Sequence, residues 1–190
     1  MKKFVTIFFK DKIDGANVNM LTDFFKGLVG ANLIEDIYGN VISYIFDSEY
    51  TVDFEEIILN INADFYLSAK LFESKDFIND NDLSSYLDMV KKIKVSSIEE
   101  DYFTDDELVI KSLGDFALIK KVILKKYYND SEMIEVIKAY LDCNMNVSQA
   151  ANRVFMHRNT VMNKIEKFID VTGYDIKKFK KAFIIYHLIY

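Results

Sequence analysis

Residues 146–167, NVSQAANRVFMHRNTVMNKIEK, carry the clearest structural pattern of the C-terminal third. It predicts a short helix that begins after Asn146 and a second helix that begins near His157. One face of the second helix is apolar at three- and four-residue spacing: Val161, Ile165 and Phe168. Two helices joined by a tight turn, the second with a polar outer face, indicate a helix-turn-helix.

The polar face of this second helix carries the side chains that contact DNA in such motifs. Asn pairs with the N6 and N7 edge of adenine, Arg and Lys bind phosphate or guanine, and Ser and Thr suit either. Arg158 follows the helix start, where free N–H groups favour a phosphate. The candidate DNA-binding residues are Ser148, Gln149, His157, Arg158, Asn159, Thr160, Asn163, Lys164 and Lys167. A solvated helix face without a ligand has the same composition, and this alternative stays open.

Charge is distributed unevenly along the 190 residues, whose net charge is −6. Residues 1–130 hold 15 Lys and 24 acidic residues, or −9, whereas residues 131–190 hold 9 basic and 6 acidic residues, or +3. The two Arg residues, Arg153 and Arg158, both lie within residues 147–168. Because Lys does not replace the planar fork of Arg at a phosphate or base edge, their position favours a nucleic-acid contact.

Residues 131–190 resemble the C-terminal helix-turn-helix of PucR/CdaR-type bacterial transcription regulators and, more distantly, the Fis-like domain. The matching positions are Asn146-x-Ser148-x-Ala150-Ala151, then Phe155-x-His157-Arg158-Asn159-Thr160-Val161, then Thr172-Gly173. The resemblance implies that this segment binds double-stranded operator DNA as a homodimer, with the His-Arg-Asn-Thr run opening the recognition helix. After the Thr the family is richer in Arg, where this chain has Met-Asn-Lys.

Upstream, the patterns predict alternating strands and helices. The expected elements are a strand at 4–9, a helix at 19–29, a hairpin within 33–46, a helix at 53–60, a strand at 64–73, a helix at 82–93, a loop at 96–107, a short strand at 108–110 and a helix at 115–127. The fold class is therefore α+β: a small α/β sandwich with an antiparallel sheet, followed by an all-α helix-turn-helix domain. We expect a sensing or dimerisation domain at 1–112 and a DNA-binding domain at 113–190, with 115–127 as a linker helix.

The N-terminal order of elements weakly resembles the degenerate GGDEF-like domain of CdaR-type regulators. The hairpin around Gly39 lacks the paired glycines and the acidic pair that a cyclase needs, so we expect no cyclase activity. A small-molecule or protein effector is expected to act on this domain.

No combination of residues suggests catalysis, a metal or a cofactor. The two histidines, His157 and His187, lie far apart in sequence, and no Gly-rich phosphate loop is present. Cys143 is expected to be a buried small hydrophobe, and Asp105-Asp106 to lie in a solvated loop. Apolar runs are too short to cross a membrane, and the chain is expected to be cytoplasmic, without a membrane partner.

Two functions follow from these patterns. The first is a homodimeric DNA-binding transcriptional regulator. The alternative is a protein-interaction or ligand-sensing module whose helix-turn-helix no longer binds DNA, since a net −9 upstream opposes the approach of a polyanion. The last helix, 176–190, is expected to pack against the helix-turn-helix core and to add some dimer contact.

Overall fold

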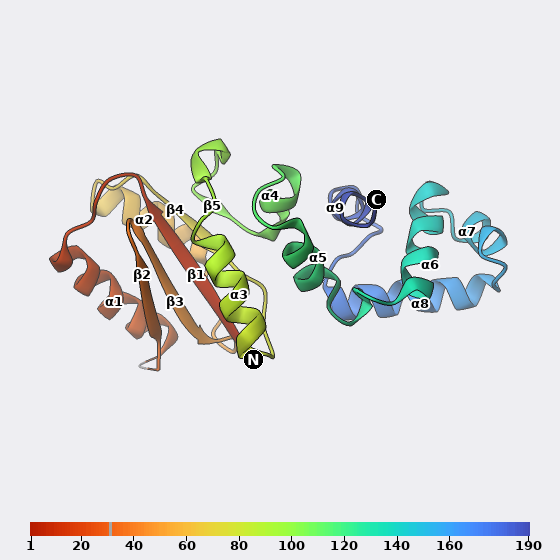
Figure 1. Ribbon diagram of the computed structural model, residues 1–190, viewed down its shortest axis with the longest axis horizontal. Coiled ribbons are helices and arrows are strands. Elements are labelled where there is room, and N and C mark those ends of the chain that lie inside the picture. The colour runs from red at the N-terminus through yellow and green to blue at the C-terminus, as the bar shows by residue number, and fades with distance from the viewer. Residues whose placement is uncertain (31) are drawn as a thin grey trace. The chain divides into compact units, whose positions relative to one another are not determined.

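The computed structural model describes residues 1–30 and 32–190. These residues form two compact units, Met1–Asp115 and Phe116–Tyr190, shown in Figure 1. The first unit combines a sheet with helices and the second is helical, which confirms the α+β class. Within the described part of the chain, no helix has both the length and the apolar character of a membrane span.

The first unit is built around a five-stranded sheet of order β2-β3-β1-β4-β5. Its elements are β1 (Lys2–Phe9), α1 (Gly15–Val29), β2 (Ile34–Tyr38), β3 (Val41–Asp47), α2 (Phe54–Asp64), β4 (Ala69–Glu73), α3 (Asp80–Val90), the 3-10 turn η1 (Val95–Ser97), β5 (Tyr102–Phe103) and α4 (Asp105–Ile110). The strand pairs are antiparallel, as expected, except that β5 runs parallel to β4.

Both faces of the sheet are covered, because successive side chains of a strand point to opposite sides. Val5, Ile7 and Phe9 of β1 belong to a buried cluster with α1 and α2. On the other face, Phe4 lies against Tyr86 of α3, with ring centroids 6.4 Å apart. The central strand β1 is thus buried on both sides, which explains its nearly continuous apolar run.

The segment before residue 110 corrects two sequence predictions. The expected strand at 108–110 is the end of helix α4, whose N-terminus is closed by a capping box between Thr104 and Glu107. The Thr104 N–H donates to Glu107 Oε2 at 2.9 Å. Asp105 and Asp106 lie in the first turn of this helix and are only 2% and 5% exposed, so they are not in a solvated loop. Local capping outweighs the β propensity of the Leu-Val-Ile run.

Element boundaries differ from the predictions in three other places. Helix α1 begins at Gly15 instead of residue 19 because Asp14 caps it. Helix α2 continues to Asp64, so β4 begins only at Ala69. Helix α3 spans Asp80–Val90 instead of residues 82–93 and is capped by Asn79, whose side chain accepts two backbone N–H groups.

The second unit is helical. Its elements are α5 (Phe116–Leu124), the 3-10 turn η2 (Lys125–Tyr127), α6 (Ser131–Asp142), α7 (Val147–Arg153), α8 (Arg158–Thr172) and α9 (Phe179–Ile189). Helix α6 contacts α7, α8 and α9. In α9, Ile184, Ile185 and Leu188 are buried, whereas Phe183 and Tyr186 stay about half exposed. Cys143 ends α6 and is half-buried, so the expectation that it is fully buried is wrong.

Candidate nucleic-acid interface

The first helix of the predicted motif, α7, is held at its N-terminus by a side-chain cap. Asn146 Oδ1 accepts the N–H groups of Ser148 and Gln149 at 3.0 and 3.2 Å. The side chains of Ser148 and Gln149 are exposed. Ala150 and Ala151, on the other side of the helix, are buried, and their small size allows α7 to approach α6 and α8 closely. The cap therefore fixes the two candidate residues at an exposed helix start.

The turn between α7 and α8 has an unusual backbone. Phe155 has a φ of +53°, in the left-handed region, and its side chain is 96% exposed. The following N–H, that of Met156, donates to Ala151 O at 3.0 Å. This geometry closes the end of α7, and residues 154–157 then lead into α8.

His157 caps the second helix. Its Nδ1 accepts the N–H of Asn159 at 3.2 Å. A neutral imidazole that accepts at Nδ1 carries its proton at Nε2, so the exposed ring keeps one N–H donor. The cap holds Arg158 and Asn159 in the first turn of α8, where the positive end of the helix dipole favours an anion.

Helix α8 has the two faces that the sequence predicts. Val161, Ile165 and Phe168 are at most 1% exposed and attach the helix to its unit. The predicted contact residues on the other face are exposed: Arg158, Asn159, Thr160, Asn163 and Lys167. Amide, hydroxyl and cationic groups thus share one open surface, which we call the α8 face.

Lys164 differs from the other candidates. Its Nζ lies 3.1 Å from Glu132 Oε1 of α6, and its side chain is only 22% exposed. Arg153 is also paired, with Asp142 at 2.8 Å. By contrast, Arg158 and Lys167 form no ion pair with any described residue. The cations available to an external anion are therefore Arg158 and Lys167 rather than all basic residues of the segment.

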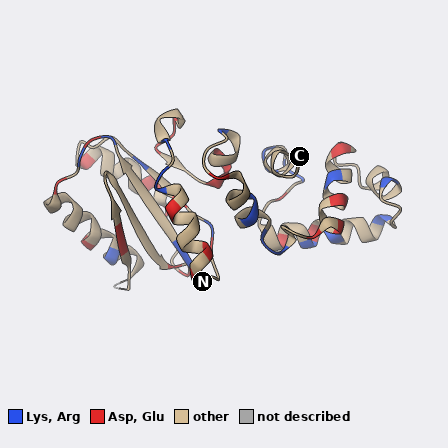
Figure 2. Ribbon diagram, in the orientation of Figure 1, with Lys and Arg blue, Asp and Glu red and all other residues tan. Residues whose placement is uncertain are grey.

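The two units differ more in net charge than the two segments compared in the sequence. Residues 1–115 hold 11 basic and 23 acidic residues, or −12, and residues 116–190 hold 13 basic and 7 acidic residues, or +6. Figure 2 shows Lys and Arg along the helices of the second unit. The positive charge of the second unit is larger than that of residues 131–190 because the unit also contains the lysines of α5 and η2, Lys120, Lys121, Lys125 and Lys126. Among the described residues, His, Cys, Asp and Glu form no group of three that could hold a metal ion.

The geometry of α7 and α8 identifies the kind of domain that the second unit forms. A capped short helix, a turn formed by residues 154–157 and a second helix with an apolar inner face and a polar outer face make a helix-turn-helix domain. Residues 133–188 match the model of the PucR C-terminal helix-turn-helix domain. The second unit is therefore of the PucR type, and the resemblance predicted from the sequence is confirmed.

One of two relatives extends the likeness beyond this domain. The Bacillus subtilis purine catabolism regulatory protein is 24% identical over 179 residues, covering 81% of this chain and 31% of that protein. The Bacillus subtilis protein YxkF is 37% identical over 60 residues, covering 32% of this chain and 20% of that protein. The chain thus spans a third or less of the length of these curated relatives.

A solved structure shows the same fold over nearly the whole chain. The regulator of polyketide synthase expression from Bifidobacterium adolescentis matches with a TM-score of 0.51 at 12% identity, covering 99% of this chain and 78% of that one. The relatives whose names state a role are regulatory proteins and not enzymes.

Proposed function

We propose that this chain is a DNA-binding transcriptional regulator that contacts duplex DNA with the α8 face. The observation that carries the proposal is the exposure of Arg158, Asn159 and Asn163 on the helix whose other side is anchored in the core. A helix of this width enters the major groove, and its first turns contact base edges.

The residues have different roles. Arg158 and the exposed Nε2–H of His157 bind phosphate beside the helix N-terminus, and Lys167 adds a phosphate contact. Asn159 and Asn163 contact base edges, with Asn suited to adenine, while Thr160 contacts either. Ser148 and Gln149, at the start of α7, form hydrogen bonds with the sugar-phosphate backbone of the DNA. Lys164 contributes only after its ion pair with Glu132 opens.

The functional division follows the charge. Residues 113–190 bind DNA, with 115–127 as the linking segment, while residues 1–112 sense an effector or dimerise. A homodimer would place its two α8 helices about one helical turn of DNA apart, on a palindromic site. The protein would act in the cytoplasm, where the bacterial chromosome lies. Analytical ultracentrifugation with and without a palindromic duplex would test the dimer.

The binding test needs a duplex that the protein itself selects. Genomic fragments are captured on the full chain, and one labelled fragment is compared with a random duplex of equal length by fluorescence anisotropy at two salt concentrations. We expect Arg158→Ala to weaken binding to both duplexes and to lower the salt slope by about one. Asn159→Ala should weaken binding to the selected duplex by roughly 1–3 kcal/mol and leave binding to the random duplex unchanged.

Lys178→Ala is the matched control. Lys178 is an exposed lysine of the same unit, outside the α8 face, and its side chain is 78% exposed. Its removal should leave the affinity close to that of the parent chain. Parent-like affinity of Arg158→Ala and Asn159→Ala would contradict the assignment of the α8 face.

The second candidate is an interaction or ligand-sensing module without DNA binding. The −12 charge of the first unit favours it, because that field repels a polyanion. A folded chain that binds neither duplex at low salt would establish this alternative over the first.

A further inference from the structure

The first unit contains a cavity of about 580 Å³ at the ends of β1 and β4. This volume is in the range of small-molecule sites in proteins. Phe9, Leu67 and Val95 contribute apolar surface to its lining, and they come from three segments that are separate in the sequence. The cavity lies within one unit and uses no residue of the α8 face.

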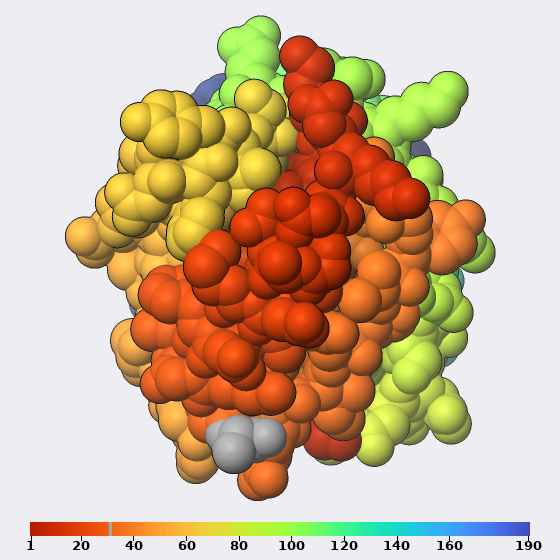
Figure 3. All heavy atoms as spheres, turned by 90° about the vertical axis from the view of Figure 1, so that its left-hand side faces the viewer, coloured from red at the N-terminus to blue at the C-terminus, as the bar shows by residue number. Residues whose placement is uncertain are grey.

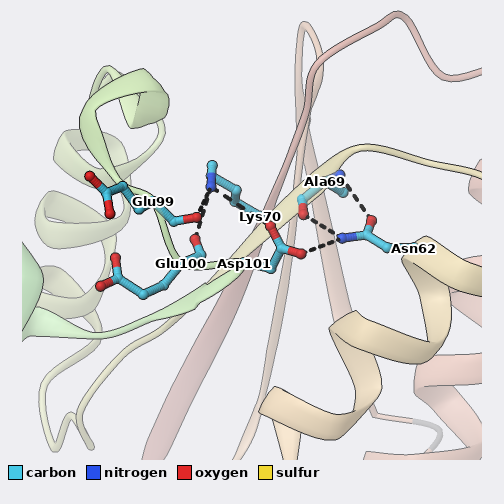
Figure 4. A network of polar contacts seen from close by, with 6 residues as sticks. All are labelled: Asn62, Ala69, Lys70, Glu99, Glu100 and Asp101. Carbon is cyan, nitrogen blue, oxygen red and sulfur yellow. Dashed lines mark hydrogen bonds and ion pairs between the residues drawn. The ribbon is translucent and has the colours of Figure 1, made fainter.

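One wall of the cavity is formed by Asn62, Ala69, Lys70 and Asp101, which the network of polar contacts in Figure 4 holds in place. Asn62 Nδ2 donates to Ala69 O at 2.9 Å and to Asp101 Oδ2 at 3.2 Å, while its Oδ1 accepts the Ala69 N–H at 2.9 Å. Lys70 Nζ donates to the carbonyls of Glu99 and Glu100 at 3.0 and 2.9 Å. The wall is thus fixed before any ligand arrives, which lowers the entropic cost of binding.

The charges on this wall compensate each other. Lys70 Nζ lies 3.7 Å from Asp101 Oδ1, so the pair leaves no net charge toward the cavity. Lys10 is the remaining charged side chain of the lining. It is exposed and makes no ion pair with the described residues, while its backbone N–H donates to Ser68 O at 3.0 Å. The lining therefore carries one uncompensated positive charge inside a unit of net charge −12.

A second, smaller cavity shares part of this lining. It has a volume of about 120 Å³ and shares Phe9, Lys10, Leu67 and Ser68, and its other charged lining residues are Asp11, Lys12 and Asp14. Figure 3 shows this end of the unit, where the red segment after β1 lies beside the yellow segment that follows α2. The smaller lining pairs two lysines with two carboxylates, whereas the larger lining has one lysine in excess, so an anion is favoured in the larger cavity.

We propose that the larger cavity binds a small aromatic or heteroaromatic carboxylate. The flat apolar body would lie against Phe9, Leu67 and Val95, and the carboxylate would bind Lys10. A single cation suits a monoanion better than a phosphate ester, which needs several cations or backbone donors. This inference concerns the first unit alone and does not depend on DNA binding.

Binding of 2-naphthoate, which is fluorescent and anionic at neutral pH, tests the proposal with the full chain. The chain has no Trp, so protein fluorescence does not obscure the probe. The neutral 2-naphthamide is the matched ligand. We expect saturable binding of the carboxylate, at least about fivefold tighter than that of the amide, because a charge-assisted bond to Lys10 forms only with the anion.

Three variants locate the site. Lys10→Gln should lower the affinity for 2-naphthoate about threefold to tenfold and leave the affinity for 2-naphthamide unchanged. Ser96→Trp places an indole in the cavity and should abolish binding of both ligands. Lys92→Gln, which removes an exposed lysine of the same unit that does not line the cavity, should change neither.

Methyl NMR provides a measurement that does not depend on the variants. The resonances of Leu67 and Val95 should shift on titration with 2-naphthoate, while those of Val136 and Ile137 in the second unit should not. No saturable binding, equal affinity for acid and amide, or shifts confined to the second unit would each overturn the proposal.

Discussion

Phe155 gives the sharpest test of how the helix-turn-helix is built. Its φ of +53° is a conformation that L-residues other than Asn and Asp adopt at a cost of roughly 1–2 kcal/mol. Since the side chain is 96% exposed, its removal sacrifices almost no buried area. Phe155→Asn should therefore stabilise the second unit by about 0.5–1 kcal/mol.

Two further substitutions separate backbone strain from packing. Phe155→Ala keeps the strain and loses only exposed atoms, so it should change stability by less than about 0.5 kcal/mol. Phe155→Val introduces a β-branched residue at positive φ and should destabilise the unit by about 1 kcal/mol or more. The expected order of stability is thus Asn above Phe and Ala, with Val lowest.

Hydrogen exchange read by mass spectrometry is the suitable assay, because it reports α7 and α8 separately from the first unit. A change of 1 kcal/mol corresponds to about a fivefold change in the protection of amides that exchange through opening of this unit. The reasoning is refuted if Phe155→Asn lowers protection, or if Phe155→Ala costs the 3–5 kcal/mol typical of a buried Phe.

Substitutions at three other positions test separate features. His157→Ala removes the acceptor for the Asn159 N–H and should cost about 0.5–2 kcal/mol in α8 protection, whereas His157→Asn should retain most of the cap; equal losses would exclude capping. Burial raises the pKa of Asp105 from 3.8 to about 6, so the folded state favours the protonated form and the parent chain should lose stability as pH rises from about 4 to 6. Asp105→Asn, whose side chain still accepts a hydrogen bond from Tyr86, should flatten this pH dependence of the unfolding free energy in urea. The same pH dependence in the variant would contradict a raised Asp105 pKa. Ala150→Leu should overpack the contacts of α7 with α6 and α8 and lower the free energy of unfolding by about 1–3 kcal/mol, measured by thermal unfolding with circular dichroism. An unchanged stability would mean that the close approach of these helices is not required.

Much of the site was predictable because its signals are local. The cap at Asn146, the cap at His157 and the apolar stripe of α8 each involve residues within one or two helical turns, so spacing alone places them. Which cations are free was not predictable. Lys164 and Glu132 are far apart in sequence, and only the packing of α8 on α6 brings them to 3.1 Å.

The first unit shows the same distinction. Glycine-containing turn residues between two β-rich runs predict the hairpin of β2 and β3. The Leu-Val-Ile run of α4 satisfies a strand pattern equally well, and the preceding capping box decided for a helix. Asp105 and Asp106 look solvated in sequence, yet the packing of α4 buries both.

Local sequence signals were sufficient for the α+β class, the helix-turn-helix and the polar composition of the α8 face, because backbone caps and hydrophobic periodicity act between near neighbours. The order of the strands, the burial of Asp105 and Asp106 and the cavity beside Lys10 depend on long-range packing. These features join segments such as 8–10, 67–70 and 95–101, and their contacts depend on how elements distant in sequence pack around β1.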